Sequence, residues 1–208
     1  MKKFLAGVRE KSGDYLLAVH DLERQPKDGK LDLFAGPRKL NVEVLKRWQT
    51  FLAEPARQGD LVLAPWFALA ALSESEFAEK ARVLIEAWKA SVAERVSVSS
   101  IGEGPAPSAT PNPIVVDAFV QTAKPVASLK DAAAVYNSVF AKVTGAGGDE
   151  AIRQLLHAPG APANVAPDEV ARMLKRQIDT KTAPLKREIE ALNWTEPGAP
   201  LRAMALVD

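Results

Sequence analysis

The sequence predicts an all-α protein, an irregular multi-helix assembly with long proline-rich loops and a short extended segment at its end. Two observations lead to this prediction. Through most of the 208 residues, apolar side chains recur at spacings of three and four, which is typical of amphipathic helices. Two stretches rich in proline, SIGEGPAPSATPNP and HAPGAPANVAPDE, separate the helical segments and are typical of loops.

An N-terminal helical part is predicted over residues 1–97. One apolar stripe from Phe4 to Leu22 predicts a single first helix, and another from Val44 to Leu52 predicts a helix that Pro55 ends. Between them, LDLFAGPRKL is predicted to be loop or short extended structure.

The most apolar stretch of the chain is LVLAPWFALAAL, from Leu61 to Leu72. It predicts a short buried helix, in which Pro65 is tolerated because it falls in the first turn. Ser73 and Glu76 then have the spacing of a capping box, which predicts the start of a long helix.

Residues 98–127 form a predicted proline-rich connection, within which IVVDAFV is either a short helix or a strand. The C-terminal helical part is predicted over residues 128–208. Ser128 and Asp131 repeat the capping-box spacing at its first helix, which is expected to end at Gly145.

Two prolines are expected to shape the remaining helices. Pro167 is predicted near the first position of the last helical stretch, and Pro184 is predicted to kink that stretch or to split it. Leu201–Asp208 alternates with a period of two and reads as a truncated strand. We expect this end to be frayed or to pair with LDLFAG, and we interpret it as a sign that the chain is a fragment.

Composition excludes several classes of function. With 27 basic and 26 acidic residues and a net charge of +1, the chain shows no phosphate-binding stripe, which argues against nucleic acid as a partner. The absence of cysteine excludes disulfides and thiolate metal sites. No stretch reaches the ~18 apolar residues of a membrane span, and the apolar run in MKKFLAGVRE is too short for an export signal.

The residues that could carry chemistry are few. The only histidines are His20 and His157, and both are interpreted as surface or partly buried structural residues. His20 precedes Asp21, but adjacent residues on a helix point in different directions. TGAGGDE lacks the lysine and the preceding strand of a phosphate-binding loop, so it predicts a helix end followed by a helix N-cap.

We therefore assign no catalytic, cofactor-binding or metal-binding residue, and we do not expect an enzyme. Trp48, Trp66 and Trp88 are predicted to be core residues because they lie on apolar faces or in the most apolar run. Trp194 is left open for an exposed role. A carbohydrate-binding site would need exposed aromatic side chains, for which Trp194 and Tyr136 are the first candidates.

Several segments together resemble one protein family. LNVEVLKRWQTFLAEP and LVLAPWFALAALSESEFAEKA, followed by SLKDAAAVYNSVFAKV, AIRQLLHAPGAPANVAPDEVARML and EALNWTEPGAPLRAMALVD, are similar to stretches of large planctomycete proteins. Those proteins carry a cytochrome-c-like domain and two paired domains of unknown function, and the similar stretches lie between the paired domains in this order.

The resemblance implies a location and partners. Relatives are exported, so it implies the periplasm or cell envelope, and it implies that the flanking domains of the full-length protein are the partners. The haem-binding CxxCH of the family lies in another domain and cannot be carried over, because this chain has no cysteine. The favoured function is a non-catalytic helical linking or interaction module. The alternatives are a module for carbohydrate binding or polysaccharide degradation, and a docking partner of the cytochrome-c-like domain.

Overall fold

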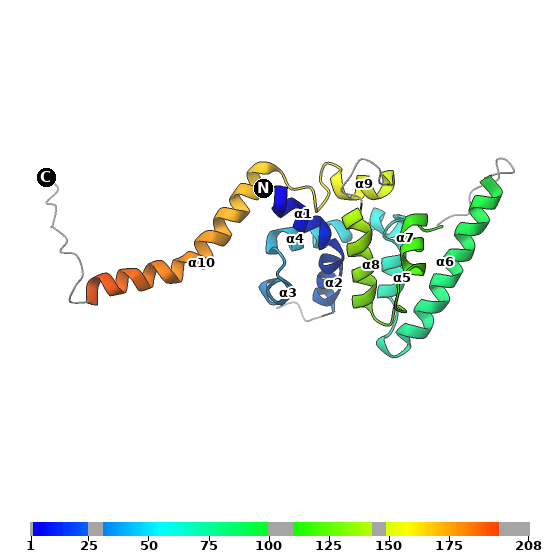
Figure 1. Ribbon diagram of the computed structural model, residues 1–208, viewed down its shortest axis with the longest axis horizontal. Coiled ribbons are helices and arrows are strands. Elements are labelled where there is room, and N and C mark those ends of the chain that lie inside the picture. The colour runs from blue at the N-terminus through cyan, green and yellow to red at the C-terminus, as the bar shows by residue number, and fades with distance from the viewer. Residues whose placement is uncertain (1, 25–30, 100–109, 143–148, 196–208) are drawn as a thin grey trace. The chain divides into compact units, whose positions relative to one another are not determined.

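The computed structural model describes residues 2–24, 31–99, 110–142 and 149–195. These residues form ten α-helices and two 3-10 helices and contain no β-strand (Figure 1), which confirms the all-α prediction. The end of the chain, where Leu201–Asp208 was expected to be extended, lies outside the described residues. The elements are α1 (Lys2–Glu10), α2 (Ser12–Glu23), α3 (Leu31–Arg38), α4 (Val42–Leu52), η1 (Pro55–Gly59), α5 (Ala64–Ala70), η2 (Glu74–Glu76), α6 (Phe77–Ser99), α7 (Pro113–Val120), α8 (Leu129–Lys142), α9 (Glu150–His157) and α10 (Pro167–Thr195).

The chain divides into two compact units, one from Lys2 to Val165 and one that begins at Ala166. The first unit holds α1 to α9 and the second holds α10. Residues 98–127, which we expected to be a connection, contain α7, and this helix packs against α6 and α8. IVVDAFV is therefore helical.

Side-chain caps begin several of the helices, because the first N–H groups of a helix have no partner within it. Asn41 starts α4, Asn112 starts α7 and Asp149 starts α9, each accepting hydrogen bonds from two backbone N–H groups. Ahead of α8, Ser128 Oγ accepts from the N–H of Asp131 at 3.2 Å, and Asp131 accepts from Ser128 Oγ at 2.8 Å. The N-cap predicted in TGAGGDE and the capping box at Ser128 are confirmed.

Asn112 joins two helix starts, since its side-chain N–H donates to Asp149 Oδ1 at 3.0 Å while its own oxygen caps α7. We expect Asn112→Ala to lower the free energy of unfolding by about 1–2 kcal/mol, the upper range for a lost cap. Urea unfolding followed by circular dichroism measures this change. Asn112→Ser keeps a capping oxygen and should lower the free energy of unfolding clearly less. Equal decreases for the two variants would contradict a capping role.

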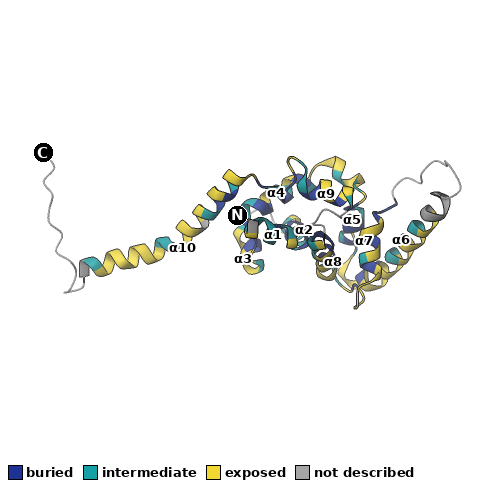
Figure 2. Ribbon diagram, turned by 45° about the horizontal axis from the view of Figure 1, so that its top comes forward, coloured by how far each residue is buried: buried dark blue, intermediate teal, exposed yellow. Residues whose placement is uncertain are grey.

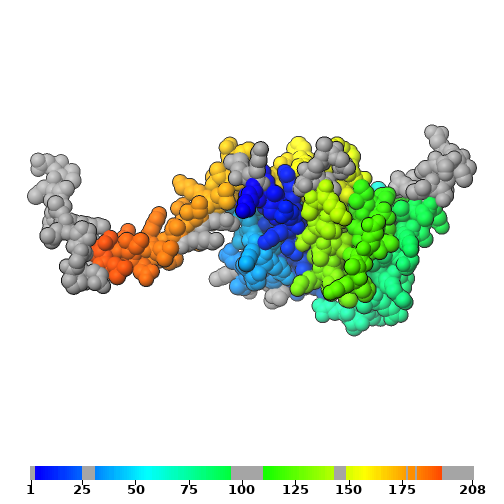
Figure 3. Space-filling view, in the orientation of Figure 1, coloured from blue at the N-terminus to red at the C-terminus, as the bar shows by residue number. Residues whose placement is uncertain are grey.

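The first predicted helix is interrupted at Lys11, so the single helix expected over Phe4–Leu22 is instead α1 and α2. The break accompanies a close approach of α2 to α8, which Figure 3 shows as contact between the blue N-terminal residues and yellow-green α8. At the crossing, the Gly13 N–H donates to Asn137 Oδ1 at 2.7 Å, and Asn137 donates back to Asp14 at 3.1 Å. Helical periodicity carries no information about such a crossing.

The LDLFAG segment is helical, so the loop or short extended structure expected there is wrong; its expected partner, Leu201–Asp208, lies outside the described residues. It forms most of α3, which buries Phe34 and Ala35. The helix ends where Lys39 takes a positive φ of 53°, and the N–H of Leu40 bonds back to the Ala35 carbonyl at 2.9 Å. Burial of one side of a short helix overrides the weak helix preference of its Gly and Pro residues.

An aromatic cluster fills the centre of the first unit. The Tyr136 ring contacts Trp66, Phe119 and Phe140 at centroid distances of 5.5–5.9 Å. Its hydroxyl donates to the Val62 carbonyl at 2.7 Å and accepts from the Trp66 N–H at 3.2 Å. This one side chain therefore joins α8 to the start of α5.

The core assignments of three tryptophans are largely confirmed. Trp48 and Trp66 are buried, and Trp66 lies in α5 with Pro65 in the first turn, as expected. Trp88 is half-buried and lies 6.1 Å from the Phe119 ring. Ser73 Oγ donates to the Glu76 carboxylate at 3.1 Å, but Ser73 precedes the 3-10 helix η2 and Glu76 ends it, so this pair does not cap α6.

The second unit contains one helix, α10, which begins at Pro167 as expected. Pro184 lies inside it without splitting it, and the ribbon bends along its length (Figure 1). Most of the second half of α10 is exposed (Figure 2). Within the described ranges, no helix is both long and apolar enough to cross a membrane.

Candidate functional site: a groove between η1 and α9

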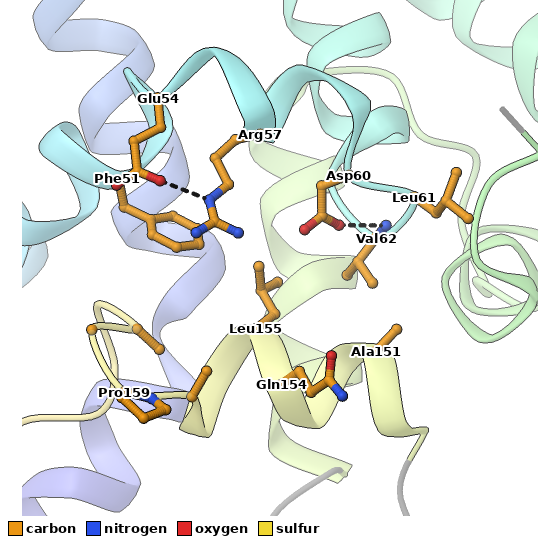
Figure 4. Close-up of a pocket in the computed structure, with 13 residues that line it drawn as sticks. Phe51, Glu54, Arg57, Asp60, Leu61, Val62, Ala151, Gln154, Leu155 and Pro159 are labelled. Carbon is orange, nitrogen blue, oxygen red and sulfur yellow. Dashed lines mark hydrogen bonds and ion pairs between the residues drawn. The ribbon is translucent and has the colours of Figure 1, made fainter.

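A groove with a volume of about 470 Å³ lies in the first unit between the segment that follows α4 and the helix α9. Figure 4 shows its two sides: Phe51, Arg57 and Asp60 on one, and Leu155 and Gln154 on the other. We call it the η1–α9 groove. Its volume is in the range of protein sites that receive small molecules or single side chains of a partner.

The positively charged group at the groove is already paired. The Arg57 guanidinium lies 3.9 Å from the centre of the Phe51 ring, and its Nε donates to Glu54 Oε2 at 3.2 Å. A cation over a ring face and an ion pair both restrain the side chain. Arg57 therefore covers the aromatic surface of Phe51 and is neutralised by Glu54.

Asp60 contributes a second carboxylate, and its role in the fold is clear. Its Oδ1 accepts from the N–H of Val62 at 2.9 Å and from that of Leu63 at 3.4 Å, which turns the chain into α5. No ion pair to Asp60 exists in the part of the chain that the structure describes. The groove thus carries one unbalanced negative charge beside the buried Val62.

The opposite wall is built by α9 and the turn that follows it. Leu155 is buried and faces the groove, while Ala151 and Gln154 are exposed at its edge. Gly160 ends this wall with a φ of +86°, a conformation that side chains other than glycine rarely adopt. The groove therefore combines an aliphatic floor with a fixed acidic edge.

Sequence reasoning missed this groove. The signal that could have found it is EPARQGD, in which Glu54, Arg57 and Asp60 follow one another at intervals of three. A 3-10 helix has three residues per turn, so this spacing places the three side chains on one face. The segment lies between two apolar helices, and nothing local shows that α9 lies across from it.

A second hollow, of about 770 Å³, contains His20 at its edge. His20 Nδ1 lies 3.5 Å from Asp21 Oδ1, although the two residues are adjacent on α2. Asp21 also pairs with Arg38 of α3. The contact is not a hydrogen bond, because His20 Nδ1 has no hydrogen-bond partner among the described residues.

Other residues considered from the sequence are structural. Ser128 lines the same hollow, but its hydroxyl belongs to the α8 cap. Burial lowers the pKa of His157, and the charges of Arg9 and Arg153 lower it further. The described residues contain no group of three or more His, Asp or Glu side chains that could hold a metal ion.

Tyr136 is not a carbohydrate platform, and its nomination as one is wrong. Its ring is buried in the aromatic cluster, and burial raises the pKa of its hydroxyl. The side chain of Trp194 lies outside the described residues. Phe51 lines the η1–α9 groove, but Arg57 lies over its ring.

Comparison with known proteins gave a plain result. No family model, curated protein or solved structure matches this chain.

Proposed function

We propose that the chain is a non-catalytic helical interaction module, which packs against neighbouring domains of a larger exported planctomycete protein. The η1–α9 groove is its docking site. The observation that supports this role is the charge at the groove: Arg57 is neutralised by Glu54, and Asp60 is left without an ion partner among the described residues.

The occupant is an extended segment of a neighbouring domain that carries an aliphatic side chain beside a lysine or arginine. The aliphatic side chain contacts Val62 and Leu155, which supply the apolar floor. The cation pairs with Asp60, whose position is set by its hydrogen bonds to the start of α5. Pairing of unlike charges at a groove edge gives such a contact its specificity.

No specific observation favours the two alternative functions. A carbohydrate module needs an open aromatic face, whereas Arg57 lies on the ring of Phe51 and Tyr136 is buried. Docking to a cytochrome-c-like domain would gain from a strongly charged surface, and the chain has a net charge of +1.

Isothermal titration calorimetry between the 208-residue chain and the adjoining domains of the full-length protein tests this proposal. Ala151→Trp fills the groove from its exposed edge and should weaken binding about tenfold or more, as expected for a change at the centre of an interface. Ala90→Trp, at an exposed position of α6, is the matched control and should bind as the unmodified chain does.

Asp60→Asn separates charge from structure, because the asparagine oxygen still accepts the two hydrogen bonds that start α5. We expect it to weaken binding several-fold and to remove most of the dependence of the affinity on salt. The proposal fails if neither adjoining domain binds, or if Ala151→Trp and Ala90→Trp bind equally well.

A further inference from the structure

An apolar stripe runs along the second half of α10. It consists of four large aliphatic side chains, Ile178, Leu185, Ile189 and Leu192, which are 60%, 57%, 58% and 49% exposed. Their spacings of seven, four and three place them within an arc of roughly 60° at ~100° per residue. An aligned apolar stripe on one helix face is typical of a packing surface and not of a solvated one.

The stripe continues towards the start of α10. It passes through the half-buried Leu174 and the exposed Ala171, with the small side chain of Thr182 near its middle. Pro184, which could disturb helix pairing, lies roughly 110° around the helix from the centre of the stripe. We call these aligned residues the α10 stripe.

A row of charges follows one flank of the α10 stripe. In chain order it reads Lys175, Asp179, Lys186 and Glu190, with signs that alternate from positive to negative. All four side chains are exposed, and none of them forms an ion pair among the described residues. Charges that flank an apolar stripe determine which partner and which direction a helix accepts.

The order of these charges distinguishes the two ways in which a second α10 could lie on the stripe. In a parallel pair related by a two-fold axis along the helices, this flank of one copy lies beside the opposite flank of the other, so the four charges do not meet one another. In an antiparallel pair, Lys175 meets Glu190 of the second copy, and Asp179 meets Lys186. All four charges are then paired with opposite ones.

The apolar side chains agree with the same antiparallel register. In the register set by the charges, which is centred between Thr182 and the next residue, Ile178 lies between Leu185 and Ile189 of the second copy. Leu192 then lies between Leu174 and the small Ala171 of the second copy. Every large exposed side chain of the α10 stripe finds an apolar partner, as knobs-into-holes packing requires.

We propose that the α10 stripe is a self-association surface, on which α10 of a second copy of this chain lies antiparallel with the two-fold axis beside Thr182. Such an interface uses the same patch on both copies, as two-fold dimers do. It lies on the second unit and is separate from the η1–α9 groove, so either proposal can fail without the other.

Sedimentation equilibrium of the full 208-residue chain measures the association. We expect a concentration-dependent monomer–dimer equilibrium. Leu185→Lys and Ile189→Lys should each weaken dimerisation about tenfold or more. Val83→Lys, at a side chain that is 61% exposed on α6, is the matched control and should dimerise normally. The proposal is overturned if the chain stays monomeric, or if Leu185→Lys and Ile189→Lys dimerise as well as Val83→Lys does.

The absence of cysteine in the chain allows the register to be tested by disulfide formation. Thr182→Cys should link to a second Thr182→Cys chain, because both lie at the axis. Ala171→Cys should link to Leu192→Cys in a mixture, with little linking of either variant to itself. Self-linking of both Ala171→Cys and Leu192→Cys would demonstrate a parallel pair and would overturn the proposed arrangement.

A charge exchange tests the flanking pairs without changing the apolar residues. Lys186→Glu places two negative charges together and should weaken dimerisation several-fold, while the double variant Asp179→Lys with Lys186→Glu should restore it. If the double variant dimerises as weakly as Lys186→Glu alone, the proposed register is contradicted. Weakened binding of a neighbouring domain by Leu185→Lys, with dimerisation unchanged, would assign the stripe to that domain and overturn the proposal.

Discussion

Replacing Gly13 with alanine is expected to lower the free energy of unfolding by about 3 kcal/mol or more, at or above the upper range for overpacked sites. A Cβ atom at this position would lie 2.0 Å from the carbonyl oxygen of Ala133 and 2.9 Å from Asn137 Oδ1. The oxygen belongs to the backbone of α8, so α2 and α8 would have to separate. Urea unfolding followed by tryptophan fluorescence measures the change.

Gly7→Ala is the matched control, because a Cβ atom on Gly7 of α1 would meet no atom within 4 Å. There the higher helix propensity of alanine should dominate and raise the stability by about 0.5–1 kcal/mol. The two substitutions are chemically identical and should differ in sign. If Gly13→Ala were as stable as the unmodified chain, the close crossing of α2 and α8 would be wrong.

The second large effect is expected at Tyr136. Tyr136→Ala should lower the free energy of unfolding by about 3–5 kcal/mol, as for other large aromatic side chains removed from a core. The ring is fully buried among Trp66, Phe119 and Phe140, so its loss leaves a cavity in the first unit. Thermal and urea unfolding of the purified variant measure the loss.

Tyr136→Phe isolates the hydroxyl from the ring. It keeps the aromatic contacts but leaves the Val62 carbonyl and the Trp66 N–H without their partner. Unsatisfied buried polar groups typically lower stability by about 1–3 kcal/mol, so this variant should lie between Tyr136→Ala and the unmodified chain. A Phe variant with unchanged stability would show that the hydroxyl does not hold α5 to α8.

Much of the helical order could be predicted because its signals are local. The side chain of Asp149 caps α9 and the Ser128–Asp131 pair caps α8 as the spacing indicated. Pro65 and Pro167 lie at the first turns of α5 and α10. Caps and prolines act on backbone groups within about four residues, so they are visible in a short stretch of sequence.

The misjudged segments are those where distant contacts outweigh local preference. LDLFAGPR has a glycine and a proline, yet it becomes α3 because Phe34 and Ala35 are buried. The apolar stripe over the first 22 residues is continuous, yet the chain breaks at Lys11, where α2 crosses α8. Tyr136 could have been an exposed platform by sequence, and only the packing around it places it in the core.

The sequence by itself determined that this protein is helical and where most of its helices begin. It also placed Trp48 and Trp66 in the core. These features could be predicted because periodicity and capping are properties of neighbouring residues. Only the tertiary structure decided which helices meet. It placed Phe51, Asp60 and Leu155 around one groove and left Ile178, Leu185, Ile189 and Leu192 exposed on α10. A helical stripe specifies that a face is apolar, but burial depends on whether another part of the fold covers it.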